Sequence, residues 1–277
     1  MTAPDLKSQV SSLKSSFKVL FIGDVIGRPG RAALGKILPE LKEQYRPQLV
    51  IANGENLAGG LGLTQGTAEE LFSYGVDLFT TGNHIWDKKE SLEYIDQEEK
   101  VLRPANYPQG APGRGYTVVE SEGSPPAAVL NLSGRVFMAP LDDPFVAANR
   151  IIPKLSEETN IIILDFHAEA TAEKIAMGWY LDGQVSAVIG THTHVQTADE
   201  RILPDHTAYI TDVGMTGPID SVIGMDKDTV IRKFLTQMPA RFEVPKGDVV
   251  VCAVIVDIEP IAGGAISIER FQRVVRR

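Results

Sequence analysis

The stretch KVLFIGDVIGRPGR, residues 18–31, decides the fold because a short apolar run in it leads into a glycine turn and a helix start. The run KVLFIG at 18–23 predicts a buried strand, since it is short, apolar and bounded by glycine. Pro29 stands where a first helical turn begins, and apolar residues follow it at helical spacing. The stretch therefore predicts a strand and then a helix, with Asp24 between them.

The same unit recurs downstream. Leu49–Ala52 predicts a second strand, followed by a glycine-rich loop at 54–62 and a helix that Thr64 or Thr67 is suited to cap. Val76–Thr81 predicts a third strand. This alternation of strand and helix implies right-handed crossovers and a parallel sheet.

After residue 98 the pattern changes. Short strands are predicted at 115–120, 127–132 and 135–139, which suggests an antiparallel portion. The remaining expected elements are strands at 161–166, 185–190, 207–212, 248–256 and 265–271, and helices at 170–181 and 226–235. No repeat or linker divides the chain. We therefore expect a loose tail over 1–17 and one α/β domain over 18–277, with two mixed β-sheets flanked by helices.

The composition bounds the class of protein. With 27 Lys+Arg and 36 Asp+Glu among 277 residues, the net charge is −9, which argues against broad charge-driven binding of nucleic acid. The longest apolar run, 249–256, is far shorter than the roughly 20 residues of a membrane helix. The single cysteine, Cys252, lies in this run, reads as an inert core thiol and fits a reducing compartment. We expect a cytoplasmic protein without a membrane partner.

Polar residues follow the predicted strands at their carboxyl ends. Four of the chain's five histidines lie at such ends. The residues concerned are Asp24, Glu55, Asn83, His84, His167, His192 and His194. Because open α/β sheets place their ligand sites at this edge, we expect these side chains to converge.

The residue types suit a transition-metal site. Carboxylate, amide and imidazole ligands without a thiolate favour Mn, Fe or Zn over Ca or Mg. More candidates are present than one tetrahedral ion uses, and two ions with a bridging carboxylate would use them all. His192 and His194 face the same side if the chain is extended there. The set indicates a binuclear metallohydrolase that acts at phosphorus.

The motifs also carry a resemblance to a known superfamily. Its five motifs, those of the calcineurin-like metallophosphoesterases, are matched in order by Gly23-Asp24, Gly54-Glu55-Asn56, Gly82-Asn83-His84, His167 and Thr191–His194. Two departures are diagnostic: Ile26 replaces the usual histidine of the first motif, and Glu55 replaces the usual aspartate of the second. These two departures make the chain similar to the bacterial YmdB family, together with the segments GDVIGRPGR (23–31), NGEN (53–56) and TTGNHIWD (80–87). The similarity runs from Lys18 to the C-terminus.

This resemblance implies a calcineurin-like metallophosphoesterase sandwich and an activity. The activity is that of a cytoplasmic phosphodiesterase that opens 2′,3′-cyclic nucleotides. Its cofactors are two divalent ions, with Fe or Mn favoured and Zn compatible.

Residue roles follow from the same resemblance. One ion is assigned to Asp24 and His194, the other to Asn83, His167 and His192, and Glu55 is the bridging ligand. Asn56 is an additional metal or phosphate contact, and water or Asn56 takes the place that Ile26 leaves. His84 is the proton donor to the leaving oxygen.

Alternatives remain open at this point. The same site suits a phosphomonoesterase or nucleotidase, because specificity depends on loop contacts that no motif names. A further interpretation is a non-catalytic, metal-stabilised RNA-binding or regulatory module, although the net charge of −9 argues against RNA binding. No device in the sequence fixes self-association, and a homo-oligomer stays open. We expect Trp86 to pack in the core rather than to stack on a nucleotide base. Asp87 is expected to cap a helix, and Asp143 and Asp226 are expected to be ordinary acids in loops or at helix caps.

Overall fold

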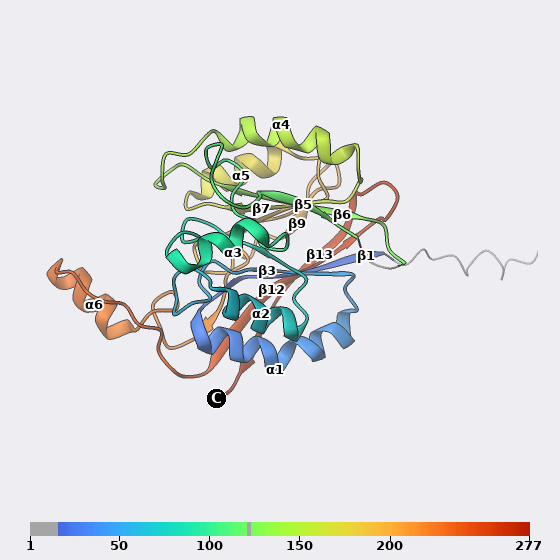
Figure 1. The fold of residues 1–277 in the computed structure, drawn as a ribbon. Coiled ribbons are helices and arrows are strands. Elements are labelled where there is room, and N and C mark those ends of the chain that lie inside the picture. Colours follow the sequence, from blue (N-terminus) through green and yellow to red (C-terminus); the bar gives the residue numbers. More distant parts are fainter. Residues whose placement is uncertain (1–15, 121–122) are drawn as a thin grey trace, which may run out of the picture.

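Two β-sheets stack face to face between two layers of helices in the computed structural model, which describes residues 16–120 and 123–277. Helices α1 and α2 lie on one outer side, and α4 and α5 on the other (Figure 1). The predicted sandwich of two mixed sheets flanked by helices is confirmed. Residues 1–15 of the expected tail lie outside the described residues, whereas Phe17 belongs to the first strand.

The first sheet contains the three parallel strands that the sequence predicts, β1, β3 and β4. A long antiparallel strand, β12, pairs with β1, and β13 pairs with β12. The strands are β1 (Phe17–Ile22), β2 (Asp24–Val25), β3 (Leu49–Asn53), β4 (Leu78–Thr80), β11 (Met215–Pro218), β12 (Val249–Ile258) and β13 (Ala265–Val275). Their order is β2-β11-β12-β1-β3-β4, with β13 beside β12.

The second sheet has the order β5-β6-β7-β8-β10-β9, in which β6, β7, β8 and β10 run parallel. Its strands are β5 (Tyr116–Val119), β6 (Ala127–Ser133), β7 (Ile162–His167), β8 (Ala187–Thr191), β9 (Arg201–Ile202) and β10 (Ala208–Ile210). The edge strands β5 and β9 are antiparallel to their neighbours.

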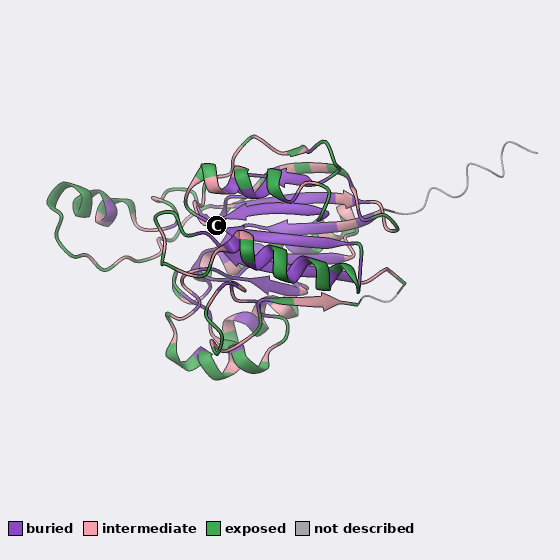
Figure 2. Cartoon of the chain, turned by 90° about the horizontal axis from the view of Figure 1, so that it is seen from above, coloured by how far each residue is buried: buried purple, intermediate pink, exposed green. Residues whose placement is uncertain are grey.

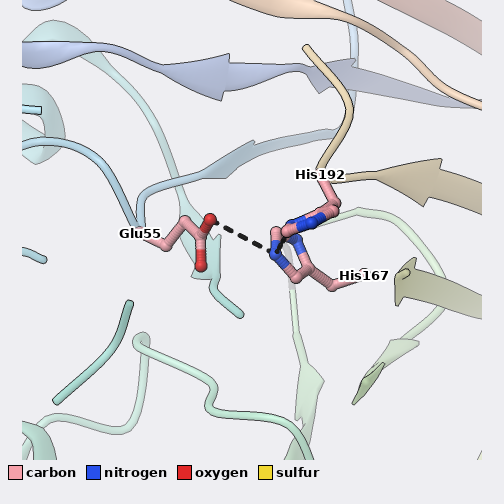
Figure 3. A group of neighbouring side chains, drawn as sticks. All are labelled: Glu55, His167 and His192. Carbon is pink, nitrogen blue, oxygen red and sulfur yellow. Dashed lines mark hydrogen bonds and ion pairs between the residues drawn. The ribbon is translucent and has the colours of Figure 1, made fainter. Parts of the chain in front are cut away.

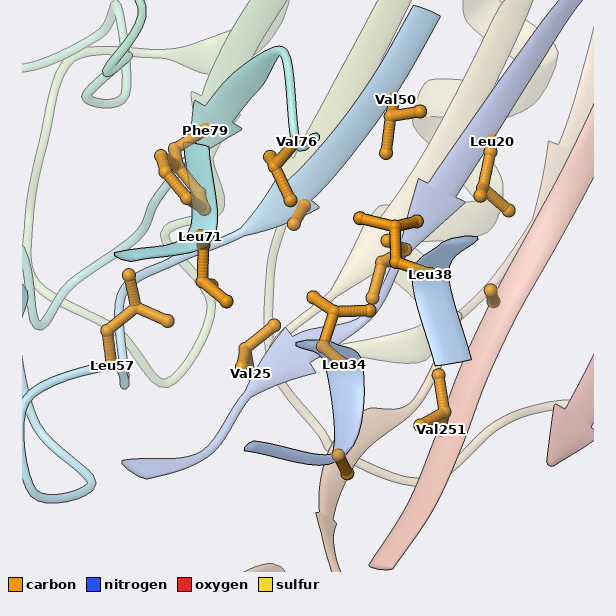
Figure 4. Packing of buried hydrophobic residues seen from close by; sticks show 14 of the residues in the cluster. Leu20, Val25, Leu34, Leu38, Val50, Leu57, Leu71, Val76, Phe79 and Val251 are labelled. Atoms are coloured by element: carbon orange, nitrogen blue, oxygen red, sulfur yellow. The ribbon is translucent and has the colours of Figure 1, made fainter. Parts of the chain in front are cut away.

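Helices α1, α2, α4 and α5 cover the outer faces of the sheets with their apolar sides, and α6 projects from the body. The helices are α1 (Gly27–Tyr45), α2 (Gln65–Tyr74), α3 (Leu92–Gln97), α4 (Pro144–Ser156), α5 (Thr171–Tyr180) and α6 (Lys227–Thr236), with a 3-10 turn η1 at Lys89–Ser91. In α1, Leu34 and Leu38 are fully buried against the first sheet, together with Leu20 and Val50 (Figure 4). None of the described helices has both the length and the hydropathy needed to cross a bilayer.

A second apolar layer fills the space between the two sheets. Phe21 of β1 and Ile163 of β7 belong to it, and both are fully buried. Viewed from above, most of the strands are buried, and the exposed residues lie mainly on the helices and loops around them (Figure 2). Cys252 lies in β12, where burial raises the pKa of its thiol to about 11, in keeping with an inert core residue. This layer packs the two sheets face to face, so that the carboxyl ends of their strands lie near one another.

The prediction of a strand at 135–139 is wrong, because this segment is a turn. The Met138 N–H donates to the Arg135 carbonyl at 3.2 Å, and Phe137 has a φ of 63°. The Glu173 carboxylate accepts from the N–H groups of Arg135 and Val136, so a side chain takes the place of a neighbouring strand.

Helix α4 is an element that the sequence patterns did not predict. Asp143 accepts from the N–H groups of Phe145 and Val146, and Pro144 stands at the first helical position. Asp143 is therefore the N-cap of α4, and Asp226 is likewise the N-cap of α6. Thr64 caps α2 in a capping box with Thr67.

Candidate metal centre

The candidate ligands come from both sheets and meet where the carboxyl ends of the strands lie together. Asp24 begins β2 and Glu55 follows β3 by two residues, so both belong to the first sheet. His167 ends β7 and His192 directly follows β8, so these two belong to the second sheet. The predicted convergence of these side chains is what the structure shows.

Glu55, His167 and His192 form a first group whose ligand atoms all lie within 4.8 Å of one another (Figure 3). Nε2 of His167 lies 3.2 Å from Oε1 of Glu55 and 2.9 Å from Nδ1 of His192. Oδ1 of Asn83 is 3.2 Å from the same nitrogen. Lone-pair-bearing atoms from four residues thus face one point, an arrangement typical of ligands for a shared cation.

Asp24, Glu55 and His194 form a second group within the same distance limit. Nε2 of His194 lies 3.7 Å from Oδ1 of Asp24 and 3.3 Å from Nδ2 of Asn56. Oδ1 of Asp24 is buried and has no hydrogen-bond partner among the described residues. Since a buried carboxylate oxygen without a partner is costly, this atom fits coordination to a cation. Glu55 belongs to both groups.

A buried hydrogen-bond chain orients His167. Its Nδ1 lies 2.9 Å from the Thr191 hydroxyl, which donates to Oδ1 of Asp165 at 2.7 Å. Nδ2 of Asn53 donates to the other oxygen of Asp165 at 3.2 Å. Because these contacts occupy Nδ1, Nε2 is directed to the ligand group. The sequence reasoning missed Asp165, although a position two residues before His167 on one strand faces the same side.

His192 has its own carboxylate partner, which the sequence reasoning also missed. Nε2 of His192 lies 3.1 Å from Oε2 of Glu169, a half-exposed side chain. Glu169 follows His167 by two residues but lies beyond the end of β7, so strand periodicity gave no signal for it.

His192 and His194 do not lie on an extended segment, so the expectation based on strand alternation is wrong. Their φ angles are 104° and 66°, in the left-handed region that favours glycine. Asp212 accepts from the N–H of the intervening Thr193 at 3.0 Å and forms a buried ion pair with Lys174 at 2.7 Å. The strained turn directs His192 to the first group and His194 to the second.

Neighbouring charged groups in the cluster shift one another's pKa values. Burial opposes ionisation of His167, but Glu55 outweighs it and raises the pKa of His167 to about 9. Burial and the charge on His167 lower the pKa of His192 to about 3. Burial also opposes ionisation of Glu55, but His167 and then His84 hold the pKa of Glu55 far below its usual range. At neutral pH the protein thus holds Glu55 and His167 as an ion pair beside a neutral His192.

His84 stands beside the cluster without belonging to either ligand group. Its backbone N–H donates to Oε2 of Glu55 at 3.0 Å, and Nδ1 of its ring lies 2.8 Å from Oδ2 of Asp87. The expectation that Asp87 caps a helix is therefore wrong, because its carboxylate is engaged by His84. Trp86 packs edge-on against Tyr107 at 5.4 Å between ring centroids and contacts the core, in agreement with the expectation.

The comparisons with known proteins agree with this geometry. A family model described as YmdB-like protein matches residues 20–271. The chain belongs to the YmdB-like family. Within it, the 2′,3′-cyclic-nucleotide 2′-phosphodiesterase of Bacillus subtilis strain 168 is 52% identical over 253 residues, which cover 91% of this chain and 96% of that protein.

Solved structures resemble this YmdB-like chain over nearly its whole length. A hypothetical protein from Thermus thermophilus is 43% identical with a TM-score of 0.87, and the match covers 93% of this chain and 99% of that one. A phosphatase from Mycoplasma pneumoniae is 36% identical with a TM-score of 0.88, over 94% of each chain. With phosphodiesterase and phosphatase relatives, the YmdB-like chain is a hydrolase.

The first-motif departure has a structural counterpart in this YmdB-like chain. Ile26 is fully buried and stands at the N-cap of α1, where it contributes no ligand atom. Asn56 instead lies beside the second group, with Nδ2 at 3.3 Å from Oε1 of Glu55 as well as from His194. The side chain of Asn56 thus lies within reach of the same group.

Proposed function

We propose that this chain hydrolyses 2′,3′-cyclic nucleotides at a centre for two divalent ions that share Glu55. The observation that carries the proposal is the pair of three-residue ligand groups with Glu55 in common. The Bacillus subtilis relative, a 2′,3′-cyclic-nucleotide 2′-phosphodiesterase, supports the substrate class. Because Asp24 and Glu55 come from one sheet and His167 and His192 from the other, the proposal treats 18–277 as one catalytic domain.

Each ion has its own ligand set in this proposal. Asp24 and His194 hold one ion, with Asn56 beside them, and the other is held by Asn83, His167 and His192. When bound, two such ions polarise the phosphoryl oxygens and lower the pKa of water for in-line attack. Iron or manganese fits these oxygen and nitrogen donors, and the proposal places the enzyme in the cytoplasm.

His84 is the proton donor in this mechanism. Asp87 engages Nδ1 of the ring and so leaves Nε2 free to face the substrate. Water adds a hydroxyl group to phosphorus, the bond from phosphorus to one ribose oxygen breaks, and His84 supplies the proton to that oxygen. The cyclic diester becomes a monoester, and the water proton that is released restores His84.

Replacement of His84 by alanine tests this role. We expect kcat to fall about 10²–10⁴-fold, the usual contribution of a general acid, with the metal content unchanged. The measurements are steady-state hydrolysis and metal analysis of the same preparation. Asp87→Asn keeps the His84 ring but weakens the contact that orients it, so this variant is expected to lose less kcat than His84→Ala. A variant that loses metal together with turnover would instead place His84 among the ligands.

Metal binding is expected to release protons. His167 carries a proton at neutral pH, because its pKa is about 9, and it must become neutral to coordinate through Nε2. Metal affinity should therefore rise with pH up to about 9 and level off above it. Calorimetric titration of metal-stripped protein with Mn²⁺ near neutral pH, in two buffers of different ionisation enthalpy, should show net release of protons. Binding without proton release would contradict the assignment of His167.

The function itself is tested with metal-stripped protein to which Mn²⁺ is added back. We expect metal-dependent hydrolysis of 2′,3′-cyclic AMP, with nucleoside monoesters hydrolysed far more slowly. Faster hydrolysis of monoesters would favour a phosphomonoesterase on the same centre. Two bound ions without turnover of either substrate would overturn the proposed reaction.

A further inference from the structure

A cavity of about 510 Å³ opens beside the first half of helix α1. The segment that leads into β12 and the residues after β13 complete its lining, and the carboxyl end of the chain lies beside α1 (Figure 1). Oδ1 of Asp248 accepts from the backbone N–H of Arg277 at 3.0 Å and holds this end in place. Because no lining residue belongs to either ligand group, the cavity is separate from the candidate metal centre.

The lining of this cavity is strongly basic. Five exposed Lys or Arg residues contribute to it and no Asp or Glu does; the five are Arg28, Lys36, Lys246, Arg276 and Arg277. Within the described part of the chain, none of the five forms an ion pair. The first turn of α1 contains no acidic residue, so the positive end of its dipole adds to the same field. In a chain whose net charge is −9, this concentration of cations indicates a site for an anion.

The deeper part of the cavity is apolar. Ala33 and Val249 are buried, and Pro29, Val244 and Val275 are partly buried. A ligand therefore meets cations at the exposed rim and aliphatic side chains below them. The volume lies in the range of roughly 300–1,000 Å³ that is usual for small-molecule sites. These features fit a small ligand that has both an anionic and an apolar part.

We propose that this cavity binds a small organic anion with at least two phosphate groups, the chemistry of a nucleoside bisphosphate. Guanidinium groups match phosphate oxygens with paired hydrogen bonds, and lysine ammonium groups add point charges. Two phosphate groups supply the several negative charges that balance the basic rim, and the organic part covers the apolar side chains. A cavity of this size holds one such molecule, whereas a nucleic acid strand requires a groove that follows several phosphates.

The cavity adjoins the loop that follows Glu55. Cγ2 of Val244 lies 2.8 Å from the place of a β-carbon at Gly60 in that loop, and 3.1 Å from one at Gly27. The N–H of Gly27 donates to the Asn56 carbonyl at 2.9 Å. A ligand in the cavity therefore contacts a side chain that packs directly on this loop.

Lysine footprinting of the metal-loaded enzyme tests the proposal. The probe is adenosine 3′,5′-bisphosphate, and acetylation of Lys36 and Lys246 is followed by mass spectrometry. At about ten times its dissociation constant the probe fills about nine in ten sites, so acetylation of both lysines should slow about tenfold. The exposed Lys100 and Lys154, outside the cavity, should react at an unchanged rate. Inorganic phosphate and adenosine each supply one part of the ligand and should bind at least about tenfold more weakly.

Neutral variants supply a second measurement. In Lys36→Gln combined with Lys246→Gln, the dissociation constant of the probe should rise at least about tenfold, because two charge-assisted contacts are lost. Calorimetric titration measures this change. Lys100→Gln combined with Lys154→Gln alters the net charge equally and is the matched control, which should bind as wild type does. Both double variants should keep their metal content.

Several outcomes would overturn the proposal. One is binding of the probe that leaves Lys36 and Lys246 unprotected, or that the double variant at these lysines does not weaken. Equal affinity for inorganic phosphate would show an adventitious ion only. Tighter binding of a short oligoadenylate would assign the basic surface to a nucleic acid strand instead. None of these results depends on hydrolysis, so they stand apart from the test of the proposed function.

Discussion

Replacement of Glu55 by glutamine is expected to abolish both metal binding and turnover. Glu55 is common to both ligand groups, so the neutral amide leaves each group with two protein ligands from that set. Hydrolysis of the cyclic diester should fall by about a thousandfold or more, because each lost ion removes several kcal/mol of transition-state stabilisation. Metal analysis after dialysis and steady-state kinetics on the same sample measure the two effects.

The titration of His167 supplies an independent readout in the metal-free protein. Glu55 is the group that raises the pKa of His167 against the effect of burial. In the Glu55→Gln variant this pKa should therefore fall well below its value of about 9, which an NMR titration of the ring protons detects. Glu173→Gln, which alters a carboxylate in the first turn of α5, is the matched control and should retain metal. A Glu55→Gln variant with full metal content would contradict the bridging role.

A single methyl group added at Gly82 is expected to disrupt the metal centre almost as severely as the replacement of Glu55. A β-carbon there would overlap the ring of His167 and come within 2.5 Å of Oε2 of Glu55. Both side chains are fully enclosed and have no room to retreat. In Gly82→Ala we expect turnover to fall at least about a hundredfold, the cost of displacing catalytic groups by about 1 Å. Overpacking should also lower the free energy of unfolding by about 1–3 kcal/mol.

Gly66 in the first turn of α2 offers the matched control. A β-carbon at this position meets no atom within 4 Å. Gly66→Ala should leave turnover unchanged and stabilise the protein by about 0.4–1 kcal/mol, because alanine restricts the unfolded chain. Thermal unfolding and kinetics of both variants, measured side by side, separate an effect of the site from the general cost of a methyl group. Equal activity in the two variants would refute the close packing around Gly82.

The strands and their order along the chain were predictable where the sequence signal is local. The apolar runs that form β1, β3 and β7 are short and bounded by turn residues, so their positions were predicted within one or two residues. The turn at 135–139 was not predictable in this way because its N–H groups bond to Glu173, which is distant in sequence. Helix α4 has Pro153 inside it, a residue whose local preference argues against a helix, so packing on the second sheet outweighs that preference.

The sequence by itself determined that carboxylate, amide and imidazole groups lie at the carboxyl ends of the strands, since strand periodicity and turn residues are local properties. Only the tertiary structure decided how these groups combine. Glu55 and His167 belong to different sheets and are far apart in sequence, and the stacking of the two sheets places Oε1 and Nε2 3.2 Å apart. The same stacking buries Asp165 behind His167. Which side chains meet depends on how the sheets pack, and no local pattern contains that information.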